Sequence, residues 1–506
     1  MLISMLNFSR SHANSKLPKL LTIYFKSCGL AAKAFDTLHA LGITMCQKWA
    51  YDGIERLSAR VRKALHNDIA NYPWFGTHDN INIPFRVYEQ RLSNQSHFDC
   101  GTAATIFVIK DPIAIRPSNH AFQQQQSVGA QDPITYKDVI KLEFSASARI
   151  RARAVYKVLS FLTDAPAFSF ETYDANYHDA FKPPTPVHQL PLGQDHMTCQ
   201  YMLNTVHIEE ASYEGNDKVL KEWWRQLGVD APEKKKDMGE NKLIVWAGDQ
   251  LTVSRIRGLH RFRAEDLNSY DRLAFLKELP GWFHTQIALE HSFHSQYYGT
   301  QAGFGLVHAF NLLKRKGLHA PSVQGTFHHH LQEALLHIAE ARFRDLWLVA
   351  GNVDKLEELR DRTPHELYAL AESIVDNHAS TAALRAMEAK KSRKDELLYQ
   401  STQMARDLLD YTHLDDAIKT GDVGSIQDMI PRLLFRFAGG KNRNYAIEML
   451  ELLQGLHKEW PDDLRTFILS YCWLVNTTGR PDKFLPIDLL QEHNVRDIKV
   501  MPFESF

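Results

Sequence analysis

The stretch KLIVWAGDQLTVSRIRGL, from Lys242 to Leu259, decides the fold. Leu243 to Ala247 form a continuous apolar run, which is typical of a strand buried on both faces of a sheet. The run ends at Gly248 and Asp249, and the residues that follow have the spacing of a helix. The stretch therefore predicts a strand, a turn that carries an aspartate, and a helix, which together are typical of an α/β core.

Other strand-like segments lie on both sides of this stretch. PWFGTHDNINIPFRV and HFDCGTAATIFVI predict two strands, which we expect to pair as a hairpin through the polar residues RLSNQS. LAFLKELPGWFH, which ends at His284, predicts one more strand. Strands are thus concentrated in two patches, Tyr72 to Ile109 and Lys242 to His284. Between them we expect a loop from Lys110 to Thr135, which includes Gln123 to Gln126, a long irregular stretch from Tyr173 to His196 and a charged loop in EKKKDMGEN. We expect helices at Tyr136 to Leu162 and Val219 to Leu227.

These patterns predict three parts along the chain. Residues 1–70 have helical spacing and form a helical N-terminal segment. Residues 71–298 form an α/β core with a mixed sheet, interrupted by a helical and irregular insertion at about 110–240. Residues 299–506 form a helical region. The fold class is therefore an α/β core with a large helical insertion and a mostly helical C-terminal part.

Composition limits the classes of protein to which the chain can belong. Its 59 basic and 60 acidic residues give a net charge of −1, so there is no overall electrostatic attraction to nucleic acid. The five cysteines include no CxxC pair, which argues against a cysteine zinc site and a disulfide framework. No apolar run reaches the length needed to span a bilayer. We expect an intracellular protein of the nucleus or cytoplasm, with no membrane contact.

Two aspartates carry the chemistry that the sequence favours most. Asp79 lies in a strand-like segment and Asp249 follows the end of one. Ligands gather at the carboxyl ends of strands in open α/β sheets, and two carboxylates placed there could hold Mg²⁺. Each residue also has a simpler interpretation, because Asp249 could cap the following helix and Asp79 could be a turn residue.

Three basic segments could contact the phosphates of nucleic acid: RIRAR from Arg149 to Arg153, LKRK from Leu313 to Lys316, and AKKSRK from Ala389 to Lys394. Solvated helix faces are the alternative interpretation of all three. The sequence contains no Walker loop, GxGxxG, GxSxG or HExxH motif, which disfavours nucleotide-triphosphate hydrolysis, dinucleotide redox chemistry and serine hydrolysis.

Seven phrases, spread in order over nearly the whole chain, resemble one family. They are SRSHANSKLPKLLTIYFKSCG, LHALGITM, THDNINIPFRV, WAGDQLTVSRIRGL, ELPGWFHTQ, GDVGSIQDMIPRLLFRFAGGKNRNYAIEML and LVNTTGRPDKFLPIDLLQEHNVRDIK. The family is domain of unknown function 6589, which is abundant in mushroom-forming fungi. Its members usually carry extra sequence on both sides, so the resemblance implies a shortened copy or a truncated gene model.

The resemblance implies a transposase-derived protein with a ribonuclease H-like core that acts on DNA with Mg²⁺. Such a core has three consecutive strands before its first helix, one aspartate on the first strand and another at the end of the fourth. Asp79 and Asp249 match those two places and would hold the metal, with His284 as a neighbour. The third acid, on a later helix, stays open between Asp422, our first choice, Glu448 and Glu333. The alternative is a catalytically inactive, domesticated protein that keeps the fold for binding.

Overall fold

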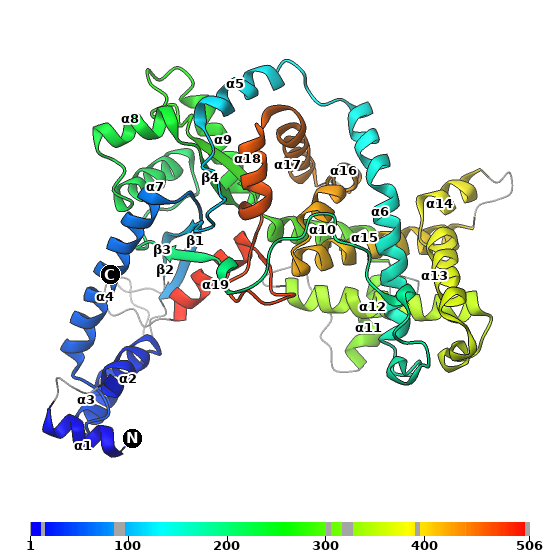
Figure 1. The fold of residues 1–506 in the computed structure, drawn as a ribbon, viewed down its shortest axis with the longest axis horizontal. Helices are drawn as coiled ribbons and strands as arrows, with labels where there is room; N and C mark the ends of the chain where they lie inside the picture. The colour runs from blue at the N-terminus through cyan, green and yellow to red at the C-terminus, as the bar shows by residue number, and fades with distance from the viewer. Residues whose placement is uncertain are drawn as a thin grey trace.

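Helices make up most of the molecule (Figure 1), which also contains a five-stranded sheet and a short two-stranded pair, β6 (Leu474–Val475) and β7 (Leu485–Pro486). The structure is a computed structural model that describes residues 2–11, 16–85, 97–299, 305–315, 327–389, 395–440 and 442–500. The RLSNQS segment, Lys316 and residues 390–394 lie outside the described residues, so two of the basic segments are described only in part.

The sheet has five strands in the order β3-β2-β1-β4-β5. β1 pairs antiparallel with β2, β2 pairs antiparallel with β3, and β4 and β5 continue from β1 in parallel. The strands are β1 (Trp74–Phe85), β2 (His97–Val108), β3 (Cys199–Met202), β4 (Ile244–Gly248) and β5 (Leu276–Pro280). The predicted mixed sheet is therefore confirmed, and four of its strands lie in the two patches that the sequence indicates.

The helices fall into three groups along the chain. Before the sheet lie α1 (Leu2–Arg10), α2 (Lys16–Ser27), α3 (Ala32–Ala40) and α4 (Gln47–Asn71). Between the strands lie α5 (Asn119–Gly129), α6 (Tyr136–Thr163), α7 (Tyr213–Gln226), α8 (Pro232–Asn241) and α9 (Gln250–Phe262). After the sheet come α10 (Trp282–Tyr297), α11 (Leu306–Arg315), α12 (His328–Gly351), α13 (Pro364–His378), α14 (Thr381–Glu388), α15 (Glu396–Thr420), α16 (Val423–Gly439), α17 (Arg443–Gln454), α18 (Asp462–Phe467) and α19 (Ile487–Val500).

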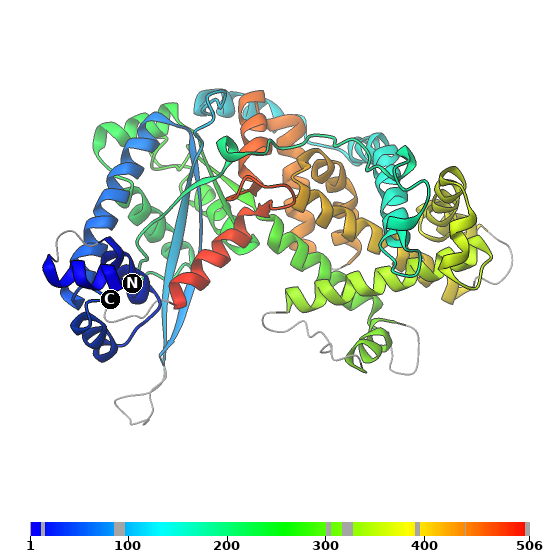
Figure 2. The ribbon, with the colours of Figure 1, turned by 60° about the horizontal axis from the view of Figure 1, so that its bottom comes forward.

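The two faces of the sheet pack into different cores because strand side chains alternate. Trp74 and Trp246 point to a core that includes Trp224 of α7 and Ile256 of α9. Phe75 points to the opposite face, in a much larger core that the helices after the sheet complete. Figure 2 shows α19, near the end of the chain, lying beside the long β1–β2 pair. The last described helix is therefore part of the sheet region rather than of the helical region.

Three expectations about local structure are wrong. EKKKDMGEN forms α8 rather than a loop, because Pro232 starts the helix and Glu and Lys favour it. Gln123 to Gln126 lie in α5, which Ser118 caps. The short strand β3 lies inside the segment assigned to the insertion. The long irregular stretch from Tyr173 to His196 contains only short 3-10 turns, as expected.

A helical body is built around the long helix α6, and its core continues the large core on the Phe75 side of the sheet. Thr135 and Asp138 form a reciprocal capping box at its start, which satisfies backbone N–H groups that otherwise lack partners. α6 then packs against α12, α13, α15 and α16. Among the described residues, no helix combines the length and the apolar character that crossing a membrane requires. The division of the chain near residues 70 and 298 stays a prediction.

Candidate functional site: an acidic cluster at the sheet edge

Asp79 and Asp249 lie at equivalent places on neighbouring strands. β1 and β4 run parallel, and Thr77 is paired with Ala247. Asp79 and Asp249 each follow two residues further along the chain, and both are half-buried. Neighbouring strands are about 4.8 Å apart, so this register sets the two aspartates side by side where β4 ends, while β1 continues to Phe85.

The local hydrogen bonds of the two aspartates match their simpler interpretations. Asp249 accepts a hydrogen bond from the backbone N–H of Thr252 at 2.7 Å and thereby caps α9. Asp79 accepts one from the backbone N–H of Asn80 at 2.7 Å. Each bond uses a single carboxylate oxygen, so these structural roles are compatible with a further role for both side chains.

His284 lies beside the two aspartates, at the start of α10. Its Nδ1 is 2.9 Å from an Asp488 oxygen, and its Nε2 is 3.9 Å from Glu492. Burial by itself lowers the pKa of His284, but the bond to Asp488 and the negative charges of Asp249 and Asp79 raise it to about 9. His284 is therefore positively charged at neutral pH, among carboxylates.

Asp488, on α19, fixes the start of α10. Its carboxylate accepts backbone hydrogen bonds from Phe283 at 3.1 Å and His284 at 2.9 Å. A Cβ atom on Gly281 would lie 2.1 Å from Asp488, so this close approach requires glycine in the PGW turn. Asp488 is thus a positioning residue that orients His284.

Glu492 follows one helical turn after Asp488 and is 40% exposed. α19 is held against the sheet on this side, because Val495 packs with Ile81 and Ala103, and Gln491 donates a hydrogen bond to the carbonyl of Ala103 at 2.8 Å. Residues three apart on a helix share a face, so Glu492 lies on the same side as Val495. The negative charge of Glu492 acts directly on Asp79.

The pKa of Asp79 reports this crowding of negative charge. Burial is the largest cause of a pKa that lies well above the usual range of aspartate. The charges of Glu492, Glu210 and Asp249 raise it further, whereas the positive charge of His284 opposes them. Like charges gathered at one place are typical of functional sites rather than of structural ion pairs.

The opposite face of β1 carries a buried polar pair. His78 Nε2 lies 2.7 Å from Glu210, and its Nδ1 accepts a hydrogen bond from Trp246 at 2.9 Å. All three side chains are buried. The hydrogen bond from Trp246 joins β4 to β1, because Trp246 is a β4 residue and His78 is the β1 residue directly before Asp79.

The three residues that the sequence suggested as the third acid of the metal site have other roles. Asp422 caps α16 and accepts hydrogen bonds from the backbone N–H groups of Val187 and His188 and from Arg153. Glu448 forms a buried double hydrogen bond with Arg257. Glu333 is exposed on α12 and lies 3.8 Å from a histidine one turn later. None of their described contacts joins them to Asp79 or Asp249.

Sequence reasoning missed Asp488, Glu492 and Glu210. The signal for the first two was available, since both lie in the phrase LPIDLLQEHNVRDIK and their spacing of four places them on one helix face. Among the residues that the structure describes, no three His, Cys, Asp or Glu side chains are arranged to hold a metal ion. Mg²⁺ therefore stays a prediction.

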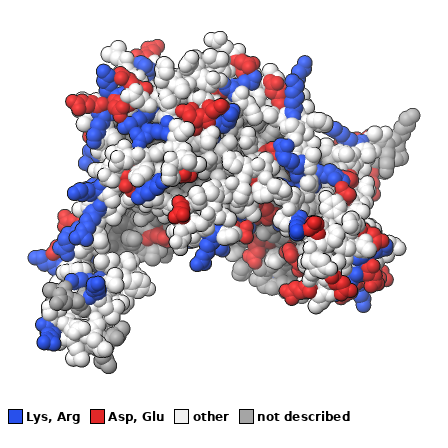
Figure 3. Space-filling model, viewed as in Figure 1, with Lys and Arg blue, Asp and Glu red and all other residues white. Residues whose placement is uncertain are grey.

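The basic segment RIRAR is used within the molecule. Arg149 pairs with Asp428, Arg151 with Asp376 and Glu372, and Arg153 with Asp422. These pairs join α6 to α13 and to the start and first part of α16. Figure 3 shows basic and acidic side chains interspersed over the face in view, consistent with the near-zero net charge.

Fold and site together define a mostly helical protein with a mixed five-stranded sheet and an acidic cluster where β1 and β4 meet. The family of unknown function DUF6589 matches residues 129–503, and the chain belongs to it. No curated protein and no solved structure matches the chain.

Proposed function

We propose that this DUF6589 member is a transposase-derived, metal-dependent nuclease that acts on DNA phosphodiester bonds. Asp79 and Asp249 would bind Mg²⁺, and Glu492 would be the third acid in place of Asp422. The observation that carries the proposal is the parallel register of β1 and β4, which sets the two aspartates level on neighbouring strands. The negative charge of Glu492, which raises the pKa of Asp79, supports the assignment of Glu492 as the third acid.

The order of elements supports a ribonuclease H-like core. Asp79 is on the first strand, Asp249 follows the fourth, and Glu492 is on a helix after the fifth. The strand β3 supplies the third strand that such a core expects. The departure is that α5 and α6 lie between β2 and β3, so the core would carry an insertion at that point.

The donor set suits a hard cation, because Mg²⁺ prefers carboxylate oxygens and keeps several waters. When bound, it would supply an activated water and stabilise the leaving oxygen of the phosphodiester. His284, held in its positive form by Asp488, would bind a phosphate oxygen and balance negative charge next to the acids. Asp488 would keep the imidazole in that orientation.

The test is cleavage of a labelled DNA duplex and a single strand with Mg²⁺ or Mn²⁺. We expect metal-dependent cleavage by the native chain and a loss of at least 100-fold in Asp249→Asn, because a metal ligand is removed. Asparagine is as good a helix cap as aspartate, so α9 is retained. Glu333→Gln is the matched control and should cleave normally. Equal activity of the native chain and Asp249→Asn would remove Asp249 from the mechanism.

The alternative function is that of a non-catalytic binding protein with the same fold. The intramolecular pairing of the RIRAR arginines and the neutral net charge favour it, since both reduce the charge available to phosphates. The same experiment separates the two functions. DNA binding without cleavage under any metal, unchanged by Asp249→Asn, would support the alternative.

A further inference from the structure

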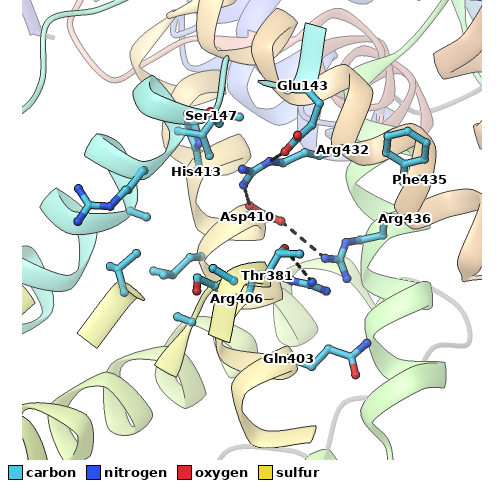
Figure 4. Close-up of a pocket in the computed structure, with 18 of the residues that line it drawn as sticks. Glu143, Ser147, Thr381, Gln403, Arg406, Asp410, His413, Arg432, Phe435 and Arg436 are labelled. Atoms are coloured by element: carbon cyan, nitrogen blue, oxygen red, sulfur yellow. Dashed lines mark hydrogen bonds and ion pairs between the residues drawn. The ribbon is translucent and has the colours of Figure 1, made fainter. Parts of the chain in front are cut away.

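The helical body contains a cavity of about 1060 Å³ that the acidic cluster does not use. Its walls come from α6, α10, α14, α15 and α16 and from the end of α13 (Figure 4). α10 connects the acidic cluster to the cavity, because His284 lies near its start and Gln296 lines the cavity near its end. A rise of about 1.5 Å per residue separates these two residues by about 18 Å along the helix axis.

Eight charged side chains contribute to the walls, and the arginines among them outnumber the acids. The lining arginines and acids are Arg151, Arg385, Arg406, Arg432, Arg436, Glu143, Asp376 and Asp410. Guanidinium groups bind phosphate oxygens in pairs and stay charged at every accessible pH. Four of these arginines are paired with acids, and the N–H donors that their ion pairs leave over favour an anionic ligand.

The acids hold the arginines in position. Arg432 donates to Glu143 at 3.1 Å and to Asp410 at 3.0 Å, and Arg436 binds Asp407 and lies 3.6 Å from Asp410. Figure 4 shows both guanidinium groups directed toward Asp410 from α16. Each guanidinium carries five N–H donors, so the two hydrogen bonds of Arg432 do not exhaust its capacity. Arg385, on α14, is exposed.

His413 is the second observation that points to a ligand. Its side chain lines the cavity and is only 7% exposed, yet neither ring nitrogen has a hydrogen-bond partner among the described residues. Burial lowers its pKa to about 4, and the positive charges of Arg153 and Arg432 act in the same direction, so the ring is neutral. A buried polar group without a hydrogen-bond partner destabilises the folded state. A ligand with a donor and an acceptor would remove that destabilisation.

Two aromatic side chains border the same cavity. Tyr136 and Phe435 have ring centroids 6.0 Å apart at an angle of 70°, and Tyr136 is 72% exposed. Exposed aromatic rings beside a basic groove are typical of sites that stack a nucleobase. The cavity thus combines guanidinium groups, an unsatisfied neutral imidazole and an open aromatic edge.

We infer that this cavity binds a nucleoside phosphate, either a free nucleotide or the terminal nucleotide of a strand. Arg385 and Arg432 bind the phosphate, the base packs on Tyr136 and Phe435, and His413 hydrogen-bonds to a polar group of the nucleoside. The inference does not depend on the acidic cluster and requires no metal. The helical body would then bind a ligand independently of the acidic cluster.

Calorimetric titration without divalent metal tests the ligand class. We expect dAMP to bind at least tenfold more tightly than deoxyadenosine or inorganic phosphate, because only dAMP reaches both the guanidinium groups and the rings. Equal binding of dAMP and inorganic phosphate, or no binding of dAMP and of a 5′-phosphorylated trinucleotide, would overturn the inference. Tighter binding of the trinucleotide than of dAMP identifies a strand end as the source, and the reverse order identifies a free nucleotide.

Three variants test the residues. Arg385→Gln and Tyr136→Ala should each weaken nucleotide binding about tenfold, since the first removes a charge-assisted hydrogen bond and the second a stacked base. His413→Phe should weaken it without lowering the melting temperature, because it removes an unsatisfied polar group from the interior. The matched controls are Arg60→Gln on α4 and Tyr177→Ala, both at exposed positions. Unchanged binding in all three variants would overturn the inference.

Discussion

The acidic residues of the helical body and those of the sheet edge have opposite surroundings. Asp407, between α10 and α16, is fully buried and contacts Arg406, Arg436 and the hydroxyl of Tyr297. Asp79, at the sheet edge, is surrounded by Asp249, Glu210 and Glu492, with His284 as the positive group that acts on it. An acid that cations surround stabilises the fold, whereas an acid among acids destabilises it and is a candidate for chemistry.

The pKa shifts follow the same division. Burial by itself raises the pKa of Asp410, but Arg432, Arg436 and Arg406 lower it overall. In Asp422 burial is likewise overcome, here by hydrogen bonds from His188, Ser425 and other donors and by Arg153. The pKa of Asp79 is raised instead, because its neighbouring charges add to the effect of burial. Substitutions in the two regions should therefore change stability in opposite directions.

The largest effect on stability should come from Asp407→Asn. It leaves two arginines next to a buried neutral amide, and breaking one partner of a buried ion pair costs about 3–5 kcal/mol. The free energy of unfolding, from urea denaturation at pH 7, measures this loss. The control is Asp354→Asn at an exposed position, which should change stability by less than about 0.5 kcal/mol. A loss below about 1 kcal/mol for Asp407→Asn would contradict the structural role.

Acidification should reveal a further buried ion pair, that of Glu278 on β5. Burial raises the pKa of Glu278, but Lys277, His260 and Arg257 overcome this and lower it from 4.5 to about 2. Because the folded pKa is lowered, its stabilisation is complete above about 4.5 and is lost as the pH falls toward 2. The loss is about 3 kcal/mol, since one pKa unit corresponds to about 1.4 kcal/mol.

Urea denaturation at pH 5, 4 and 3 checks this dependence. Glu278→Gln should lower stability at pH 5 and flatten the fall between pH 5 and pH 3, because the titrating group is gone. If the variant and the native chain lose stability in parallel over this range, Glu278 is not the group responsible.

Asp79→Asn should change the free energy of unfolding in the opposite direction and by a smaller amount. It removes a charge from a cluster of like charges, whose repulsion is on the order of 1 kcal/mol. The free energy of unfolding at pH 7 should therefore stay level or rise by about that amount, while metal-dependent activity is lost. A loss of more than about 1 kcal/mol would place Asp79 with the structural acids of the helical body.

The sequence predicts the sheet well where strands are apolar and poorly where they are not. Leu243 to Ala247 are an unbroken apolar run, and the β1 segment is rich in aromatic and β-branched residues, so both were recognisable. β3, with the sequence CQYM, has four half-buried or exposed residues at the edge of the sheet and no distinctive pattern. α8 is highly charged, and its helix depends on intrinsic propensity rather than on an apolar face.

The sequence indicated the two aspartates of the sheet but not the acids that α19 brings to them. Asp249 follows from the rule that ligands gather at strand ends, and Asp79 was found by its place in a strand-like segment. Asp488 and His284 are 204 positions apart. α19, which packs against β1, follows all the helices of the helical body in the chain. Asp422 in GDVG has the pattern of a helix cap, and the structure uses it as one. Local pattern cannot separate a capping aspartate from a catalytic one, because both precede a helix.

The smallest effect on stability should come from Glu492→Gln, which tests the third acid directly. The side chain is 40% exposed and keeps its shape in glutamine, so the free energy of unfolding should change by less than about 0.5 kcal/mol. In the native chain Mg²⁺ or Mn²⁺ should raise the melting temperature, and this increase should shrink in Glu492→Gln and persist in Glu333→Gln. DNA cleavage should fall with it. If the metal raises the melting temperature of Glu492→Gln as much as that of the native chain, Glu492 is not a ligand and its assignment as the third acid is wrong.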